Sequence, residues 1–213
     1  MDQVFGYDVD EAIDSEEALR AHAKAPSEVV RNKVTDHVDP LAARFIAAAP
    51  LAFVSSRRPD GVLDMTPRGD PAGFVHVLDP KTLALPDRPG NFRMDMFANV
   101  MDNGQVGLIF VIPGIRDTLR VSGTARLVRD KALGERLAVN GKPPQFILLI
   151  RVSRVMGHCP KAFIRGKIWE PEAWPDTSDV PSVAEMVKAH AELPQPIEEL
   201  EEIVRVSNTE RLY

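Results

Sequence analysis

Six apolar runs separated by turn residues constrain the fold of this chain more than any other feature of its sequence. Each run is short, rich in Val, Ile, Leu and Phe, and bounded by residues that favour turns, as β-strands are. In TLRVSGTARLV, apolar Leu119, Val121 and Ala125 alternate with polar residues, and this period of two predicts a strand with one buried face. The runs cover residues 51–56, 73–79, 82–87, 106–113, 118–128 and 146–158.

Helices are predicted to interrupt these strands rather than to follow each of them. Within the strand region, helical patterns cover only residues 93–101, 130–139 and 160–169. So few crossover helices favour an antiparallel barrel over a doubly wound parallel sheet. We therefore predict a mainly β fold of the α+β class: a six-stranded antiparallel β-barrel with flanking helices.

The segments on either side of the barrel have a different texture. Residues 1–49 are predicted to form an N-terminal helical segment that packs on the barrel, with Pro40 able to divide its second helix. Residues 50–175 form the barrel domain, and residues 176–213 form an acidic C-terminal extension with two short helices. This extension is too thin to be a second domain.

Charge is distributed unevenly along the chain. Residues 1–19 carry seven acids and no bases, whereas residues 50–170 carry eighteen bases and eleven acids. A basic centre between acidic ends indicates that the centre binds an anion. Because the bases are dispersed and the net charge of the whole chain is −5, no nucleic-acid partner is expected.

Several classes of protein are excluded at this stage. No apolar run approaches the length of a membrane span, and the acidic N-terminus lacks the pattern of a signal peptide. The single cysteine, Cys159, cannot form an internal disulfide, so a cytoplasmic location is expected. The five histidines are far apart in sequence, so no metal site is expected. The glycine-rich loops that bind nucleotide phosphates are also missing from the sequence. Any chemistry should therefore be that of a cofactor.

A stiff cationic turn is the best candidate for holding such a cofactor. Arg88 and Arg93 flank Pro89-Gly90-Asn91, and Arg68 lies on a strand segment before them. Guanidinium groups match phosphate oxygens, and a glycine lets the backbone approach a ligand closely. The alternative is that these arginines cap turns and pair with nearby aspartates, and the sequence leaves both interpretations open. The aspartates in question are Asp70, Asp87 and Asp95.

An ordered series of motifs gives this pattern a family. The series is MTPRGDPAGFV, LPDRPGNFRMD, VGLIFVIPG, DTLRVSGTA and GHCPKAFIRGKIW. It resembles the pyridoxamine 5′-phosphate oxidase-like superfamily, and more narrowly a bacterial branch of FMN-dependent members. The resemblance implies a split β-barrel with FMN bound between the two barrels of a homodimer. It also implies the residues that contact FMN: Arg68, Pro86, Asp87, Arg88, Asn91, Arg93, Thr118 and, more weakly, Arg120.

The last motif departs from that of the true oxidases, so the resemblance does not extend to their vitamin substrate. His158 is a candidate for handling a proton, although a histidine at a strand end often only bonds to the backbone. Lys161 and Arg165 are four residues apart and share a helix face, where they either attract an anionic substrate or are simply solvated.

Taken together, these patterns predict an FMN-dependent oxidoreductase, reduced by NAD(P)H or a small organic substrate. The alternative is a non-catalytic flavin- or haem-binding module, a sensor or carrier, in which His158 or His190 would be an axial ligand of haem. A deazaflavin is a third candidate cofactor, because some relatives use one.

Overall fold

The computed structural model describes residues 1–210 and 212–213, so residue 211 of the predicted C-terminal extension lies outside it. The chain forms two compact units, Met1–Val34 and Thr35–Tyr213. The first unit contains a hairpin whose turn residues Phe5 and Gly6 both have positive φ, as tight two-residue hairpins require. Its elements are β1 (Asp2–Val4), β2 (Tyr7–Val9), α1 (Glu16–His22) and α2 (Glu28–Asn32).

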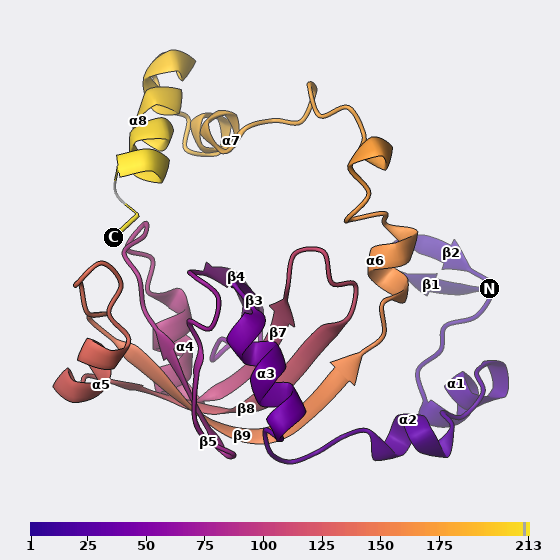
Figure 1. Cartoon of the computed structure of the whole chain (residues 1–213). Helices are drawn as coiled ribbons and strands as arrows, with labels where there is room; N and C mark the ends of the chain where they lie inside the picture. Colours follow the sequence, from indigo (N-terminus) through magenta and orange to yellow (C-terminus); the bar gives the residue numbers. More distant parts are fainter. Residues whose placement is uncertain (211) are drawn as a thin grey trace. The chain divides into compact units, whose positions relative to one another are not determined.

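A seven-stranded antiparallel sheet dominates the second unit (Figure 1). The strands follow the order β4-β3-β7-β8-β9-β6-β5, and the sheet curls around one apolar core. The strands are β3 (Leu51–Arg57), β4 (Leu63–Gly69), β5 (His76–Asp79), β6 (Thr82–Pro86), β7 (Gln105–Val111), β8 (Thr118–Val128) and β9 (Ile147–His158).

The predicted α+β class and the antiparallel sheet with flanking helices are confirmed, with two differences. The sheet has seven strands instead of six, and it is open, with β4 and β5 at its edges. The additional strand, β4, is the segment that carries Arg68; it contains no buried residue and therefore no apolar run. It also contains Pro67, which lacks an N–H and is tolerated in a strand only at a sheet edge.

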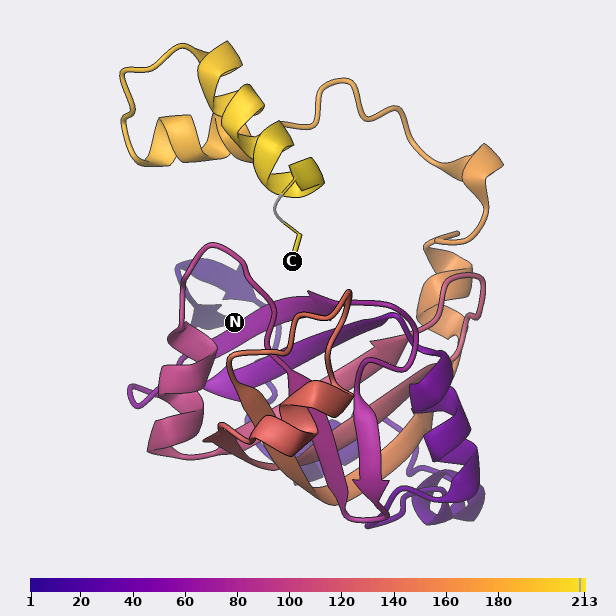
Figure 2. The ribbon, with the colours of Figure 1, turned by 60° about the vertical axis from the view of Figure 1, so that its left-hand side comes forward.

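The inner face of the sheet forms the core together with two helices. In β3, Ala52 and Val54 point inward and are buried, whereas Phe53 points outward and is 46% exposed. Helix α3 (Pro40–Ala48) adds Ile46 to this core, and α4 (Asp95–Asp102) adds Phe97. Both helices lie beside the curled sheet (Figure 2). This burial fixes which strand residues face the core and which face outward.

Pro40 marks the start of a helix in the N-terminal part of the second unit. The second helix predicted within residues 1–49 is divided, since α3 begins at Pro40. Asp39 caps α3, because its carboxylate accepts a hydrogen bond from the Ala42 N–H at 2.7 Å. The remaining helices are α5 (Lys131–Arg136), α6 (Lys161–Arg165), a 3-10 turn (Pro171–Ala173), α7 (Val183–His190) and α8 (Ile197–Glu210). None of the described helices has the length and apolar character needed to cross a membrane.

A β-bulge interrupts the pairing of β8 with β9. The register shifts between Ser122 and Gly123, so that Ser122 lies opposite Arg154 and Gly123 lies opposite Val152. Ser153 is the extra residue on β9. Beyond it the inward side chain is Val155, and Arg154 points outward.

Candidate functional site

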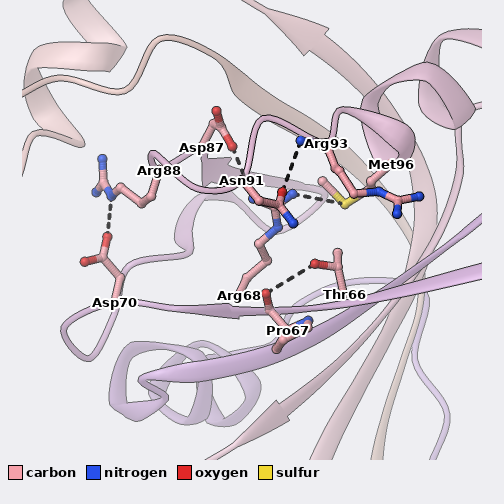
Figure 3. Close-up of polar contacts among 9 residues, drawn as sticks. All are labelled: Thr66, Pro67, Arg68, Asp70, Asp87, Arg88, Asn91, Arg93 and Met96. Carbon is pink, nitrogen blue, oxygen red and sulfur yellow. Dashed lines mark hydrogen bonds and ion pairs between the residues drawn. The ribbon is translucent and has the colours of Figure 1, made fainter. Parts of the chain in front are cut away.

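Arg88 of the cationic turn forms a buried ion pair with Asp70, the residue that follows β4. Its Nε lies 2.5 Å from Oδ2 of Asp70, and the side chains of Arg88 and Asp70 are only 15% and 1% exposed. Nη2 of Arg88 also donates to the carbonyl oxygen of Leu137 at 2.8 Å. The guanidinium group of Arg88 is thus held by two contacts, of which Figure 3 shows the one to Asp70.

Arg68 extends from β4 into the same cluster. Its Nη1 donates to Asp87 at 3.1 Å, and its guanidinium carbon lies 5.5 Å from the centre of the Phe97 ring. Figure 3 shows this side chain between the turn and Met96, whose sulfur lies 3.9 Å from Nη2. The Nε of Arg68 is buried, and none of the described residues accepts a hydrogen bond from it. Burial raises the pKa of the Asp87 carboxyl above its usual value, although the ion pair with Arg68 opposes that shift.

The end of the turn is more open. Arg93 is 75% exposed and pairs with Asp95 at 2.7 Å, while its backbone N–H donates to the side chain of Asn91 at 3.1 Å. Asn91 is exposed, and Pro86 is buried at the end of β6. Arg93 points away from the Arg88–Asp70 pair (Figure 3).

The predicted alternative, in which arginines pair with aspartates, therefore describes these contacts well. Each of the three arginines has one aspartate partner. The Arg68–Asp87 and Arg88–Asp70 pairs cross between the β4 segment and the turn, whereas Arg93 pairs with an aspartate two residues ahead. We call Arg68, Asp70, Asp87 and Arg88 the arginine–aspartate cluster. A phosphate group still has donors here, since the Arg68 Nε is unpartnered and Arg93 is reachable from solvent. The residues fit a phosphate, which would compete with the aspartates.

Two partners of the cluster were not predicted from sequence. The hydroxyl of Tyr213 donates to Oδ1 of Asp70 at 2.6 Å, and this bond raises the pKa of the tyrosine. Tyr213 is 143 residues away from Asp70 in the chain, and Leu137 contributes only a backbone oxygen. Neither contact has a signal in the sequence.

A second group of predicted residues lies around the start of β8 and the end of β9. Thr118 is 6% exposed and pairs in register with the exposed His158. Lys161 and Arg165 are exposed on α6, which follows directly. The Trp169 indole N–H donates to the carbonyl oxygen of Ile115 at 2.9 Å and so connects this region to the loop before β8.

The two groups do not form one site within a single chain. Across the sheet, Arg68 lies in one row with Ala52, Phe110, Leu119 and Gly157. Four strand spacings separate the ends of this row, or about 19 Å along the sheet. Because Arg68 is in register with the buried Ala52 and Phe110, it lies on the inner face of the sheet as they do.

Arg120 is also separated from the arginine–aspartate cluster. It lies in register with Ile109, which is opposite Phe53, and all three are exposed on the outer face of the sheet. Arg68 and Arg120 therefore project from opposite faces of the sheet. The structure brings Arg68, Asp87 and Arg88 together and leaves Arg120 elsewhere.

Comparison with known proteins identifies the family. A sequence model of the family described as pyridoxamine 5′-phosphate oxidase matches residues 38–159, more than half of the chain. The protein belongs to the pyridoxamine 5′-phosphate oxidase family. The match includes the arginine–aspartate cluster, Thr118 and His158, whereas Lys161, Arg165 and Tyr213 of this family member lie beyond it. No curated protein matches the chain.

Solved structures similar to this family member include three bacterial proteins. HupZ of Group A Streptococcus is 20% identical, with 56% of this chain and 93% of that chain covered and a TM-score of 0.46. An FMN-binding protein from Syntrophomonas wolfei is 11% identical, with 54% of this chain and 82% of that chain covered and a TM-score of 0.43. General Stress Protein 26 from Bacillus anthracis is 13% identical, with 54% of this chain and 88% of that chain covered and a TM-score of 0.41.

The remaining candidates for ligand chemistry are dispersed. His190 ends α7 and is exposed, and Cys159 is an exposed free thiol beside His158. Among the described residues, no group of three or more His, Cys, Asp or Glu side chains is arranged to hold a metal ion.

Proposed function

We propose that this protein binds FMN at the arginine–aspartate cluster and acts as an FMN-dependent oxidoreductase. The observation that carries the proposal is the buried Nε of Arg68, which has no hydrogen-bond partner in the described part of a chain that belongs to this family. An unpartnered buried donor is costly, and an acceptor such as a phosphate oxygen would satisfy it. The turn from Pro86 to Arg93 adds the exposed guanidinium of Arg93 and the amide of Asn91.

The two aspartates of the cluster set a condition on this binding. With Asp70 and Asp87 ionised, the four residues of the cluster carry no net charge. A phosphate dianion therefore gains most from donors that the aspartates leave free, and it competes most easily with Asp87, whose pKa is raised. The basic region 50–170 adds a favourable field at longer range.

The flavin would supply the redox chemistry, accepting a hydride from NAD(P)H or from a small organic substrate. The chain would orient the ring and shield it from water. Lys161 and Arg165 would attract an anionic substrate, and His158 would hold or release a proton beside it. A cytoplasmic location also remains part of this proposal.

A homodimer would bring the two separated groups together. His158 and α6 lie about 19 Å along the sheet from Arg68, too far to meet within one chain. The outer face of the sheet exposes a set of large apolar side chains, as interfaces do. This set, which we call the outer apolar face, consists of Phe53 (46% exposed), Met65 (75%) and Ile109 (39%). We propose that a second copy of the chain covers it.

Phe53→Glu is expected to convert the dimer to a monomer, because it places a charge in the centre of the outer apolar face. The measurement is the molar mass by light scattering over a range of concentrations. Leu41→Glu is the control, since Leu41 is 72% exposed on α3 and lies outside this face. A wild-type protein of monomer mass with flavin bound would refute the dimer.

Arg93→Ala is expected to weaken FMN binding about tenfold or more, as the loss of a charged hydrogen bond does. Flavin fluorescence quenching gives the dissociation constant. Arg58→Ala is a matched control: Arg58 also pairs with an aspartate two residues ahead, on an exposed turn. Equal FMN affinity in both variants would return Arg93 to a turn-capping role. A Soret band instead of flavin absorption would favour the haem-binding module.

A further inference from the structure

The outer face of β8 and β9 carries a small hollow lined by two arginines. Its volume is about 110 Å³, and its walls are Arg120 and Ser122 of β8 with Arg154 and Met156 of β9. This is more than enough space for several water molecules, and so for a tetrahedral oxyanion. The β-bulge at Ser122 and Gly123 places Arg154 on this face.

The arginines of this hollow differ from those of the arginine–aspartate cluster. In the part of the chain that the structure describes, neither Arg120 nor Arg154 forms an ion pair with a carboxylate. Arg68, Arg88, Arg93 and Arg116 each have one. The hollow therefore holds uncompensated positive charge, whereas the cluster does not.

The strand register places the two arginines beside each other on adjacent strands. Arg120 lies opposite Met156, and Ser122 lies opposite Arg154, so the arginines are diagonal neighbours on adjacent strands. Diagonal neighbours have Cα atoms about 7–8 Å apart, within reach of long side chains. Like charges at this spacing repel each other unless an anion lies between them. Ser122 adds a hydroxyl that donates to such an anion.

More positive charge follows along the same face. Arg126 of β8 and Arg151 of β9 are exposed on this face, four residues beyond Ser122 and three residues before Arg154. They extend the positive field without lining the hollow. The arrangement suits a compact, multiply charged anion at one end of a basic strip.

We infer that the hollow between Arg120 and Arg154 binds the phosphate group of a small molecule other than the flavin. The site is separate from the arginine–aspartate cluster because Arg120 and Arg68 project from opposite faces of the sheet. Two guanidinium forks and one hydroxyl match the acceptor oxygens of a phosphate. The inference holds whether or not FMN binds at the cluster.

Inorganic phosphate is the probe, titrated into the full chain and followed by calorimetry and by the NMR signals of the arginine Nε–H groups. The signals of Arg120 and Arg154 are expected to shift, and Arg120→Ala and Arg154→Ala should each weaken binding about tenfold or more. Arg126→Ala removes the same charge from the same face outside the hollow, and it should change the affinity less than about threefold.

Three results would overturn the inference. The first is equal phosphate affinity in wild type and in the Arg120→Ala/Arg154→Ala double variant, with both shown to be folded by their unfolding transitions. The second is competition, in which saturating FMN displaces phosphate from Arg154. The third is a double variant that turns monomeric while its phosphate affinity is unchanged, which would assign the two arginines to a subunit interface.

Discussion

Replacing Arg88 with alanine is expected to lower the free energy of unfolding by about 3–5 kcal/mol. Among the described residues, the substitution leaves the Asp70 carboxylate, whose side chain is 1% exposed, with the Tyr213 hydroxyl as its one remaining side-chain partner. It also leaves the Leu137 carbonyl oxygen without its donor. A buried charge that loses its counter-ion is among the most destabilising changes a single residue can cause. Urea unfolding followed by circular dichroism measures the loss.

Two further variants separate charge from geometry at this position. Arg88→Lys keeps a cation beside Asp70 but loses the hydrogen bond from Nη2 to the Leu137 carbonyl oxygen. It should therefore lower the free energy of unfolding less than Arg88→Ala does. In the Asp70→Asn/Arg88→Ala double variant the buried charge is gone, and part of the stability should return. A loss below about 1 kcal/mol in Arg88→Ala would mean that the pair is not buried as described.

The second large effect is expected at Gly123, where Gly123→Ala should cost about 3 kcal/mol, at the upper end of the range for overpacking. A Cβ at this position would clash with the Arg151 carbonyl oxygen, which is backbone and cannot rotate away. The bulge that shifts the register of β8 against β9 would have to change. Since the bulge sets the outward position of Arg154, phosphate binding at the hollow should weaken as well.

Gly157→Ala is the matched control for this prediction. Gly157 lies on β9 beyond the bulge, and a Cβ there would meet no atom within 4 Å. Its unfolding midpoint should stay near that of the wild type. Gly123→Ala with an equally unchanged midpoint would contradict the close approach of β8 and β9 at the bulge.

Much of this fold could be predicted from the sequence because burial leaves a pattern in it. The inward residues of β3, β7 and β8 alternate with outward ones, and apolar runs mark each of these strands. β4 has no such run, since it is an edge strand with no buried residue, and a count of apolar runs therefore misses it. A strand that contributes its Arg68 rather than a hydrophobic side chain to the centre of the molecule has little periodic signal.

The candidate site was predicted in composition but not in its pairing. The sequence identified the arginines and the aspartates as possible partners, because they are close together in the chain. That Arg68 binds Asp87 while Arg88 binds Asp70 follows only from how β4 lies against the turn. Neither Tyr213 nor Arg154 stands in the cationic turn or beside its aspartates. The contact of Tyr213 with Asp70 depends on long-range packing, and the place of Arg154 in the hollow depends on the bulge.

Adding FMN to the purified protein tests whether the chain binds this cofactor. After gel filtration, we expect a yellow protein peak with one FMN per chain, at the mass of a dimer. The flavin should be weakly held in Arg93→Ala and tightly held in Arg58→Ala. A colourless protein peak with all of the FMN eluting free would contradict the claim.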